Sequence, residues 1–216
     1  MQSVDPRDRE DLAAFLLRLR SEHLDSRLLA AVEKVPRRNF VMAGVANAYG
    51  DASLPIDCGQ TMPGAHFAVS LVAALHIEEG NSVLEVGSGS GYVTALLARL
   101  GARVASLDRY RRLIAAAGAR LKELGLANAV FELEDGRGGY PSMAPYDRII
   151  LHGAFDAVPR VFLEQLAAHG YLICAVGPAR EEQMLVRMQK VGSRFEREDL
   201  RPVRYLPLEP GVATVL

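Results

Sequence analysis

Cysteine is scarce in this sequence: Cys58 and Cys174 are its two cysteines among 216 residues, and they lie far apart in unrelated contexts. The chain has no Cys-x-x-Cys pair and no grouping of cysteine and histidine at the spacing of metal ligands. Neither a disulfide framework nor a structural metal is therefore expected. This cysteine usage fits a reduced protein, and we expect a cytoplasmic location.

An excess of charge of one sign is also missing. The 25 lysine and arginine residues are balanced by 26 aspartate and glutamate residues, which gives a net charge of -1. A protein that binds nucleic acid irrespective of its sequence would carry a basic excess, so nucleic acid is not the expected partner. No apolar run approaches the length of a membrane span and no signal-peptide pattern opens the sequence, so no membrane contact is expected. The oligomeric state is left open.

The N-terminal third contains helical and irregular segments. Apolar residues recur at helical spacing from Leu12 to Leu19 and again from Leu28 to Val32. Residues 37–65 are irregular and rich in glycine, aspartate and proline, whereas residues 68–75 return to helical periodicity. We expect residues 1–78 to form an N-terminal helical and loop extension that covers the active site.

From residue 79 onward, short apolar strands alternate with amphipathic helices. Strands are expected over 82–86, 103–107, 129–133, 147–151, 171–176, 184–188 and 195–206. Helices are expected over 92–100, 113–124 and 158–166. This alternation predicts an α/β fold, with a mostly parallel central sheet and helices on both faces. Residues 79–216 are therefore expected to be a Rossmann-like catalytic core.

Glycine and acidic residues cluster where the predicted strands end. Ligands of open α/β sheets bind beyond the carboxyl ends of the strands, so these residues are expected to line one site. The candidates for binding a cofactor are Glu85, Gly87, Ser88, Gly89, Gly91, Asp108, Arg109, Asp135 and Gly136. His152 follows a further strand and is a candidate on the acceptor side.

Each of these residue types has a physical role in binding a nucleotide. Glycines at 87, 89 and 91 remove Cβ atoms, so the backbone can turn tightly and touch a ligand. The helix that begins near Tyr92 directs its free N–H groups and positive end toward this loop. Asp108 can accept hydrogen bonds from both hydroxyls of a ribose, and Asp135 can accept one from an exocyclic amine such as that of adenine.

The spacing of the glycines separates two cofactor classes. Nicotinamide dinucleotides are bound by GxGxxG, and Tyr92 stands here at the position of the third glycine. An acidic residue followed by GxGxG is instead typical of S-adenosylmethionine-dependent methyltransferases, and we favour S-adenosylmethionine as the cofactor. A dinucleotide, or a tight turn that binds no ligand, is the alternative.

Several segments at matching intervals resemble the protein-L-isoaspartate O-methyltransferase family. Residues 83–92 resemble its cofactor motif, tyrosine included, and residues 34–41 resemble its KVPR-x-x-FV entry segment. Further similarities are at 54–56, 59–61, 144–149, 165–166 and 175–177. The resemblance spans nearly the whole chain. It implies a class I, Rossmann-like methyltransferase with a rearranged C-terminal strand order, which methylates the α-carboxylate of isoaspartyl residues in a peptide or protein substrate, a protein-repair reaction.

The loop at residues 59–65 departs from the family pattern. Pro63 replaces a serine that the resemblance places in the active site, and Cys58 stands where the family often has histidine. His152-Gly153 occupies a turn where small and hydroxylated residues are usual. Two alternatives therefore stay open. One is a methyltransferase of the same fold that acts on a small metabolite, a modified peptide or nucleic acid, and the other is a non-catalytic cofactor-binding homologue.

Methyl transfer to a carboxylate needs little acid–base help. A carboxyl group has a reference pKa of about 4 and is already ionised at neutral pH. Gln60, Thr61 and His152 are the candidate catalytic residues, with Thr61 either contacting the acceptor or satisfying loop backbone groups. His66 or His152 could deprotonate an amine acceptor, although either histidine could instead be structural. Glu85 is expected to hold the cofactor loop or the amino group of the cofactor.

Overall fold

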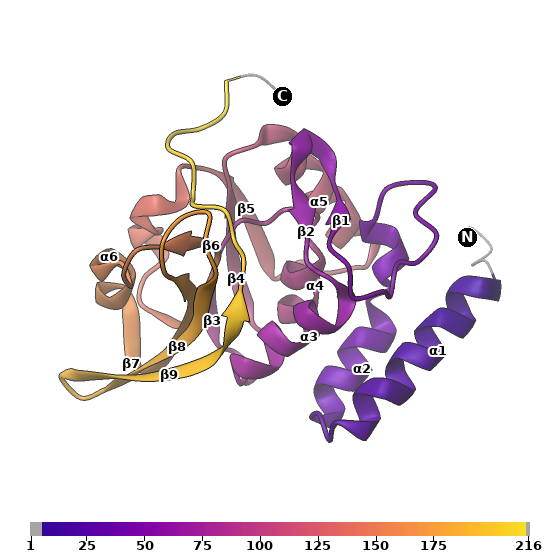
Figure 1. Ribbon diagram of the computed structural model, residues 1–216, viewed down its shortest axis with the longest axis horizontal. Helices are drawn as coiled ribbons and strands as arrows, with labels where there is room; N and C mark the ends of the chain where they lie inside the picture. Colours follow the sequence, from indigo (N-terminus) through magenta and orange to yellow (C-terminus); the bar gives the residue numbers. More distant parts are fainter. Residues whose placement is uncertain (1–5, 215–216) are drawn as a thin grey trace.

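The strand–helix alternation after residue 81 forms a seven-stranded sheet in the computed structural model, which describes residues 6–214 (Figure 1). The strands are β3 (Ser82–Val86), β4 (Arg103–Asp108), β5 (Ala129–Leu133), β6 (Tyr146–Phe155), β7 (Leu166–Val176), β8 (Gln183–Val191) and β9 (Arg194–Val203). Their order across the sheet is β5-β4-β3-β6-β7-β8-β9. The first five in this order pair in parallel, and β8 and β9 add antiparallel at one edge. The predicted mostly parallel sheet is confirmed.

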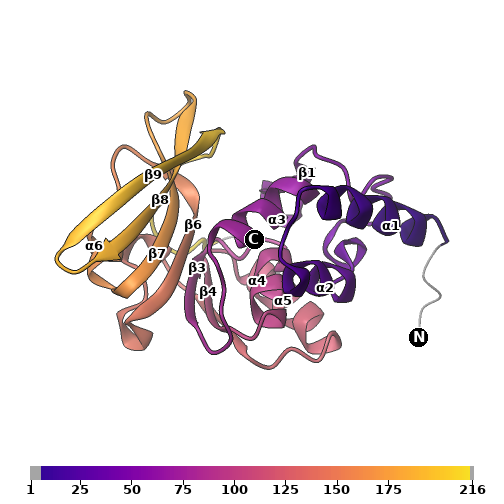
Figure 2. The same cartoon turned by 90° about the horizontal axis from the view of Figure 1, so that it is seen from below.

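Helices cover both faces of the sheet (Figure 2). One face packs against α3 (Ala65–Ala74), α4 (Tyr92–Arg99) and α5 (Arg111–Glu123), and the other against α6 (Arg160–Glu164). Neighbouring residues in a strand point to opposite faces, so Val83 joins the core beneath α4 and Leu84 joins the core beneath α6. Burial on both faces explains the apolar runs in the central strands β3, β4 and β6, whereas the edge strands β5 and β9 are more exposed.

The N-terminal segment packs onto the layer that contains α3, α4 and α5. Its elements are α1 (Pro6–Ser21), α2 (Ser26–Lys34), the 3-10 turns η1 (Arg37–Phe40) and η2 (Asp57–Gly59), and the short strands β1 (Leu54–Pro55) and β2 (Thr61–Met62). Helix α2 begins after Asp25, whose side chain accepts a hydrogen bond from the backbone N–H of Arg27 at 3.0 Å. Phe15 and Val83 belong to the same hydrophobic cluster. The two predicted regions thus share a core, and the boundary at residue 78 stays a prediction.

Some predicted element bounds are wrong. The helix expected over 158–166 begins only after Pro159 and is limited to Arg160–Glu164, because Leu166 pairs with Tyr146 as the first residue of β7. The turn expected at His152-Gly153 is instead part of β6, which continues through a register shift after Ile150. The last strand ends at Val203 rather than Leu206, because the chain then leaves β9, and Pro207 forms an isolated parallel bridge with Ala154 of β6.

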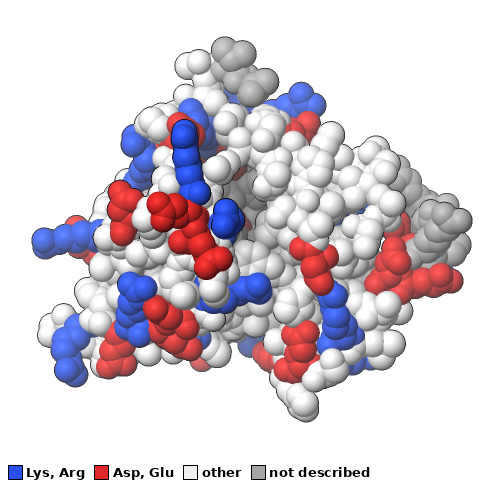
Figure 3. Space-filling model, in the orientation of Figure 1, with Lys and Arg blue, Asp and Glu red and all other residues white. Residues whose placement is uncertain are grey.

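None of the helices within residues 6–214 is both long and apolar enough to cross a membrane. Acidic and basic side chains are intermixed over the face of the molecule that Figure 3 shows, as the balanced composition predicts.

Candidate functional site

A cavity of about 530 Å³ lies at the carboxyl ends of β3, β4, β5 and β6. The predicted site residues that line it are Gln60, Thr61, Glu85, Gly87, Ser88, Gly89, Asp108, Arg109, Asp135, Gly136 and His152. Gly91, which is also a predicted site residue, is not part of this lining. The structure therefore brings together residues from five separate segments of the chain.

The glycine loop between β3 and α4 is held against β4 by its backbone. The N–H groups of Gly87 and Ser88 both donate to the carbonyl of Leu107, at 2.8 and 3.1 Å. Gly91 has a φ of +83°, and a Cβ there would lie 2.8 Å from the Cβ of Ala117 in α5. Gly91 thus permits close packing of the loop on α5, whereas Gly87 and Gly89 present backbone to the cavity.

Asp108 is the last residue of β4, and its carboxylate orders the glycine loop. One oxygen, Oδ2, accepts from the N–H of Gly89 at 2.9 Å, and Oδ1 accepts from the N–H of Tyr110 at 3.0 Å. Burial raises the pKa of Asp108, and these two hydrogen bonds oppose the rise. A carboxylate has about four acceptor positions, so Asp108 can still accept from a ligand in the cavity.

Glu85 lies at the centre of a buried polar network beneath the loop. Its side chain is fully buried, and Oε2 accepts from the hydroxyls of Thr94 and Ser106. The hydroxyl of Ser106 lies 2.6 Å from that of Ser88, so the network connects β3 and β4 to the glycine loop. Glu85 is thus connected to the glycine loop through Ser106 and Ser88, and its role in holding a cofactor stays a prediction. Ser106 and Thr94 were missed from sequence, although Ser106 pairs with Glu85 in the sheet register.

His152 projects from β6 toward the same network. Its Nε2 lies 3.2 Å from Oε1 of Glu85, and 13% of its side chain is exposed. The Cβ of His152 would be 3.0 Å from a Cβ built on Gly87, so the histidine packs closely against the glycine loop. This contact favours an orienting role for His152, and a catalytic role for it stays a prediction.

Asp135 and Arg109 contact the C-terminal tail, a contact that the sequence did not reveal. Residues 204–213, named here the C-terminal strap, run across the cavity, and residues 204–209 line it. Asp135 accepts from the N–H of Gly211 at 2.8 Å and pairs with Arg137 at 2.9 Å. Arg109 donates to the carbonyls of Gly211 and Pro210 at 2.9 and 3.2 Å. The guanidinium of Arg137 holds the pKa of Asp135 well below its usual range.

The segment from Asp57 to Gly64, named here the acceptor loop, forms the opposite wall of the cavity. Gln60 donates through Nε2 to the carbonyl of Cys58 at 3.3 Å and lies 3.4 Å from the hydroxyl of Tyr110. The side chain of Thr61 is exposed at the cavity. The carbonyl of Pro63 accepts a hydrogen bond from Nη2 of Arg37.

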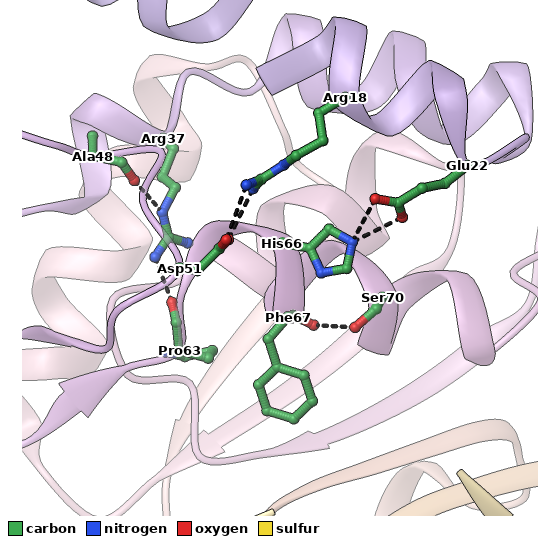
Figure 4. A network of polar contacts seen from close by, with 9 residues as sticks. All are labelled: Arg18, Glu22, Arg37, Ala48, Asp51, Pro63, His66, Phe67 and Ser70. Atoms are coloured by element: carbon green, nitrogen blue, oxygen red, sulfur yellow. Dashed lines mark hydrogen bonds and ion pairs between the residues drawn. The ribbon is translucent and has the colours of Figure 1, made fainter. Parts of the chain in front are cut away.

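Helix α1 also contacts this region (Figure 4). Arg18 pairs with Asp51 at 2.8 Å, and Glu22 pairs with His66 at 2.8 Å. His66 is not part of the cavity lining and is engaged with Glu22, so the structure does not bring this candidate base to the site. Cys58 is also outside the lining, and Cys174 is buried in β7, where burial raises the pKa of its thiol to about 12.

Comparison with known proteins decides the family. The model of the protein-L-isoaspartate(D-aspartate) O-methyltransferase family matches residues 10–213. The chain belongs to this family. A protein-L-isoaspartate O-methyltransferase from Parvibaculum lavamentivorans is 42% identical over 214 residues, which cover 98% of this chain and 96% of the relative. Another, from Azorhizobium caulinodans, is 43% identical over 211 residues and 97% of each chain. The resemblance noted in the sequence is confirmed.

Solved structures show the same fold. A protein-L-isoaspartate O-methyltransferase structure superposes with a TM-score of 0.82 at 21% identity, over 93% of this chain and 67% of that chain. A Plasmodium falciparum structure described by the same activity, in complex with S-adenosyl-L-homocysteine, gives a TM-score of 0.77 at 20% identity, over 91% of this chain and 97% of that chain. The predicted class I methyltransferase fold is confirmed.

Proposed function

We propose that this chain transfers a methyl group from S-adenosylmethionine to the free α-carboxylate of isoaspartyl residues in peptides and proteins. Membership of the protein-L-isoaspartate(D-aspartate) O-methyltransferase family over residues 10–213 is the observation that carries the proposal. Relatives that are 42% and 43% identical over nearly their whole length are named for this activity. A protein or peptide is accordingly the substrate, and its isoaspartyl residue the methylated group.

The cavity walls fit the proposed cofactor. The carboxylates of Asp108 and Asp135 line the cavity and can accept hydrogen bonds from a nucleoside. A Cβ on Gly136 would lie 2.3 Å from a side-chain carbon of Val86, and one on Gly87 would lie 3.0 Å from the Cβ of His152, so glycine at both positions lets the backbone around the cavity pack closely on β3 and β6. We propose that Gly87, Gly89, Asp108 and Asp135 hold S-adenosylmethionine. When bound, this cofactor supplies an electrophilic methyl group on a sulfonium.

On the acceptor side, the residues of the chain position a nucleophile that is already charged. An isoaspartyl carboxylate is ionised at neutral pH, so no side chain has to remove a proton from it. Gln60 and Thr61 of the acceptor loop would orient this carboxylate, and the C-terminal strap would exclude water from the other side. Holding two reactants in line contributes effective molarities of about 10⁵–10⁸ M in well-oriented systems.

The alternative acceptors are less well supported. An amine acceptor would need a base, but His66 is paired with Glu22 outside the cavity and His152 contacts Glu85. Nucleic acid would need a basic surface, but the net charge of the sequence is -1, and acidic and basic side chains are mixed on the face that Figure 3 shows. The substitution at Pro63 is the observation that favours a different acceptor. The cytoplasmic location, the domain boundary and the roles of individual site residues stay predictions.

A methyl-transfer assay with labelled cofactor tests the proposal. The isoaspartyl form of a peptide and its normal aspartyl twin are compared side by side, and label is expected only in the isoaspartyl form. S-adenosylhomocysteine is expected to raise the melting temperature, since a ligand selective for the folded state stabilises it. Stabilisation without labelling of either peptide would contradict the proposed acceptor. Stabilisation by a nicotinamide dinucleotide alone would contradict the proposed cofactor.

A further inference from the structure

Arg37 is the first residue of η1 and is fully buried. Its Nε donates to the carbonyl of Ala48 at 2.6 Å, and its Nη2 donates to the carbonyl of Pro63 in the acceptor loop (Figure 4). Its backbone N–H donates to the hydroxyl of Tyr49 at 3.2 Å. These contacts fix the plane of the guanidinium, because its donors have a rigid fork geometry.

The same guanidinium stacks on Tyr92, the residue that follows the glycine loop. Its central carbon lies 4.8 Å from the centroid of the Tyr92 ring, and Phe40 packs edge-on against the same ring with centroids 5.4 Å apart. Tyr92 is the first residue of α4 and is itself buried. A single side chain therefore contacts both the acceptor loop and the start of the helix behind the cofactor loop.

Arg37 carries its charge without an acidic partner. None of the ion pairs among the residues that the structure describes includes Arg37, and its Nη1 is buried without a hydrogen-bond partner. Burial lowers the pKa of the Arg37 guanidinium. Its hydrogen bonds go instead to the backbone carbonyls of Ala48 and Pro63, which belong to two different loops. It also lines the cavity.

We propose that Arg37 is a positioning residue that sets the separation between the methyl acceptor and the methyl donor. By binding the carbonyl of Pro63 and stacking on Tyr92, it holds the acceptor loop in register with the glycine loop. Lysine has one compact ammonium and cannot bind two carbonyls and stack on a ring with the same geometry. The proposal rests on the proposed function for the identity of the acceptor, but the contacts that carry it are independent of that identity.

Arg148 provides a matched structural control. It is also buried, donates through Nε to the carbonyl of Leu75 at 2.6 Å and through Nη2 to that of His76 at 2.9 Å, and stacks 4.9 Å from the ring centroid of Tyr171. It lies near the amino end of β6 and is not part of the cavity lining. Arg37→Lys and Arg148→Lys therefore remove the same kind of contact, one beside the cavity and one away from it.

The two variants are compared with the wild type in three measurements. These are the melting temperature, the Kd for S-adenosylhomocysteine by calorimetry, and kcat and KM for an isoaspartyl peptide. Both variants are expected to lose melting temperature. Arg37→Lys is expected to lose about ten- to a hundredfold in kcat, since displacement of a reacting group by about 1 Å can cost a hundredfold, while its Kd stays near the wild-type value. Arg148→Lys is expected to keep kcat and KM.

Hydrogen–deuterium exchange in residues 57–64 gives a readout that does not depend on turnover. These amides are expected to exchange faster in Arg37→Lys and at the wild-type rate in Arg148→Lys. A wild type without isoaspartyl activity would contradict the proposed function, and loop exchange would still decide whether Arg37 fixes the loop. Equal kcat and equal loop exchange in the two variants would overturn the proposal. If Arg37→Lys fails to fold, Tyr92→Leu removes the ring on which Arg37 stacks instead. Wild-type kcat together with wild-type exchange of the acceptor loop in Tyr92→Leu would also overturn the proposal.

Discussion

Replacing Asp108 with asparagine changes one atom at the edge of the cavity. The carboxylate of Asp108 accepts from the N–H groups of Gly89 and Tyr110, and the residue as a whole is 8% exposed. Asparagine keeps one acceptor oxygen and turns an amide donor toward the other partner. The variant therefore loses one buried acceptor together with the negative charge, while the size of the side chain is preserved.

The expected magnitude follows from the hydrogen bonds that Asp108 makes. A donor left unpaired in a buried position costs about 1–3 kcal/mol of unfolding free energy. On the ligand side, a hydrogen bond to a charged group is worth about 1.5–3 kcal/mol, and 1.4 kcal/mol corresponds to tenfold in affinity. Asp108→Asn is thus expected to weaken cofactor binding by roughly ten- to a hundredfold or slightly more.

Calorimetric titration with S-adenosylhomocysteine measures this loss. Asp147→Asn is the matched control, because Asp147 also accepts a hydrogen bond from a backbone N–H, that of Ser82 at 2.8 Å. This contact lies at the amino ends of β3 and β6, away from the cavity. Both variants are expected to lose some stability to denaturant, and only Asp108→Asn is expected to lose affinity. Wild-type affinity in Asp108→Asn would refute the reasoning and remove Asp108 from the cofactor site.

Pro63→Ser adds a hydroxyl to the acceptor loop and keeps the carbonyl to which Arg37 donates. The initial rate of methylation of an isoaspartyl peptide is therefore expected to rise by about tenfold. An unchanged rate would show that the hydroxyl is dispensable. Arg109→Ala removes the donors to the carbonyls of Pro210 and Gly211 in the C-terminal strap. Backbone amides in residues 205–213 should therefore exchange faster with deuterium than in the wild type. Exchange at the wild-type rate would argue that Arg109 does not hold the strap. Pairing with Arg137 depresses the pKa of Asp135 below its ordinary value of 3.8. The ionised carboxylate therefore stabilises the folded state fully at pH values above 3.8, and this stabilisation is lost as the pH falls from 3.8 toward the depressed pKa. Asp135→Asn should be less stable than the wild type at neutral pH, and the difference should shrink in acid unfolding experiments; a constant difference would contradict the pairing.

The parallel part of the sheet could be predicted because its signal is local. The strand expected at 82–86 coincides with β3, whose apolar run is buried on both faces. The strand expected at 129–133 coincides with β5, which is only partly buried but rich in β-forming residues. The carboxyl end of β6 could not be predicted in this way. His152 and Gly153 look like a turn in the sequence, but the chain stays extended because the N–H of Ala154 donates to the carbonyl of Leu206 at 3.0 Å. That partner is distant in the sequence and leaves no local pattern.

The same distinction applies to the candidate site. Gly87, Gly89, Asp108, Asp135 and Gly136 line the cavity, since the position of a strand end fixes the position of the residues after it, whereas Gly91 packs against α5 outside the lining. The partners of the acids were not identified. Asp135 was expected to face a ligand, and its contacts with Arg137 and Gly211 depend on the path of the C-terminal strap. The path of a segment without regular structure is set by tertiary contacts rather than by periodicity.

The contacts that hold the acceptor loop and the residues around it differ in strength, and this difference explains why the loop can accommodate Pro63. The Arg18–Asp51 and Glu22–His66 pairs that tie α1 to this region are partly exposed, and such pairs are worth about 0–1 kcal/mol and weaken with salt. The hydrogen bond from Arg37 is buried and directed at a backbone carbonyl. Because the carbonyl at position 63 is present whatever the side chain, the loop can keep its place when serine is replaced by proline. If the chain acts on isoaspartyl carboxylates as proposed, we therefore expect Pro63 to change the chemistry offered to the acceptor, and we expect Arg37 to hold the loop in position.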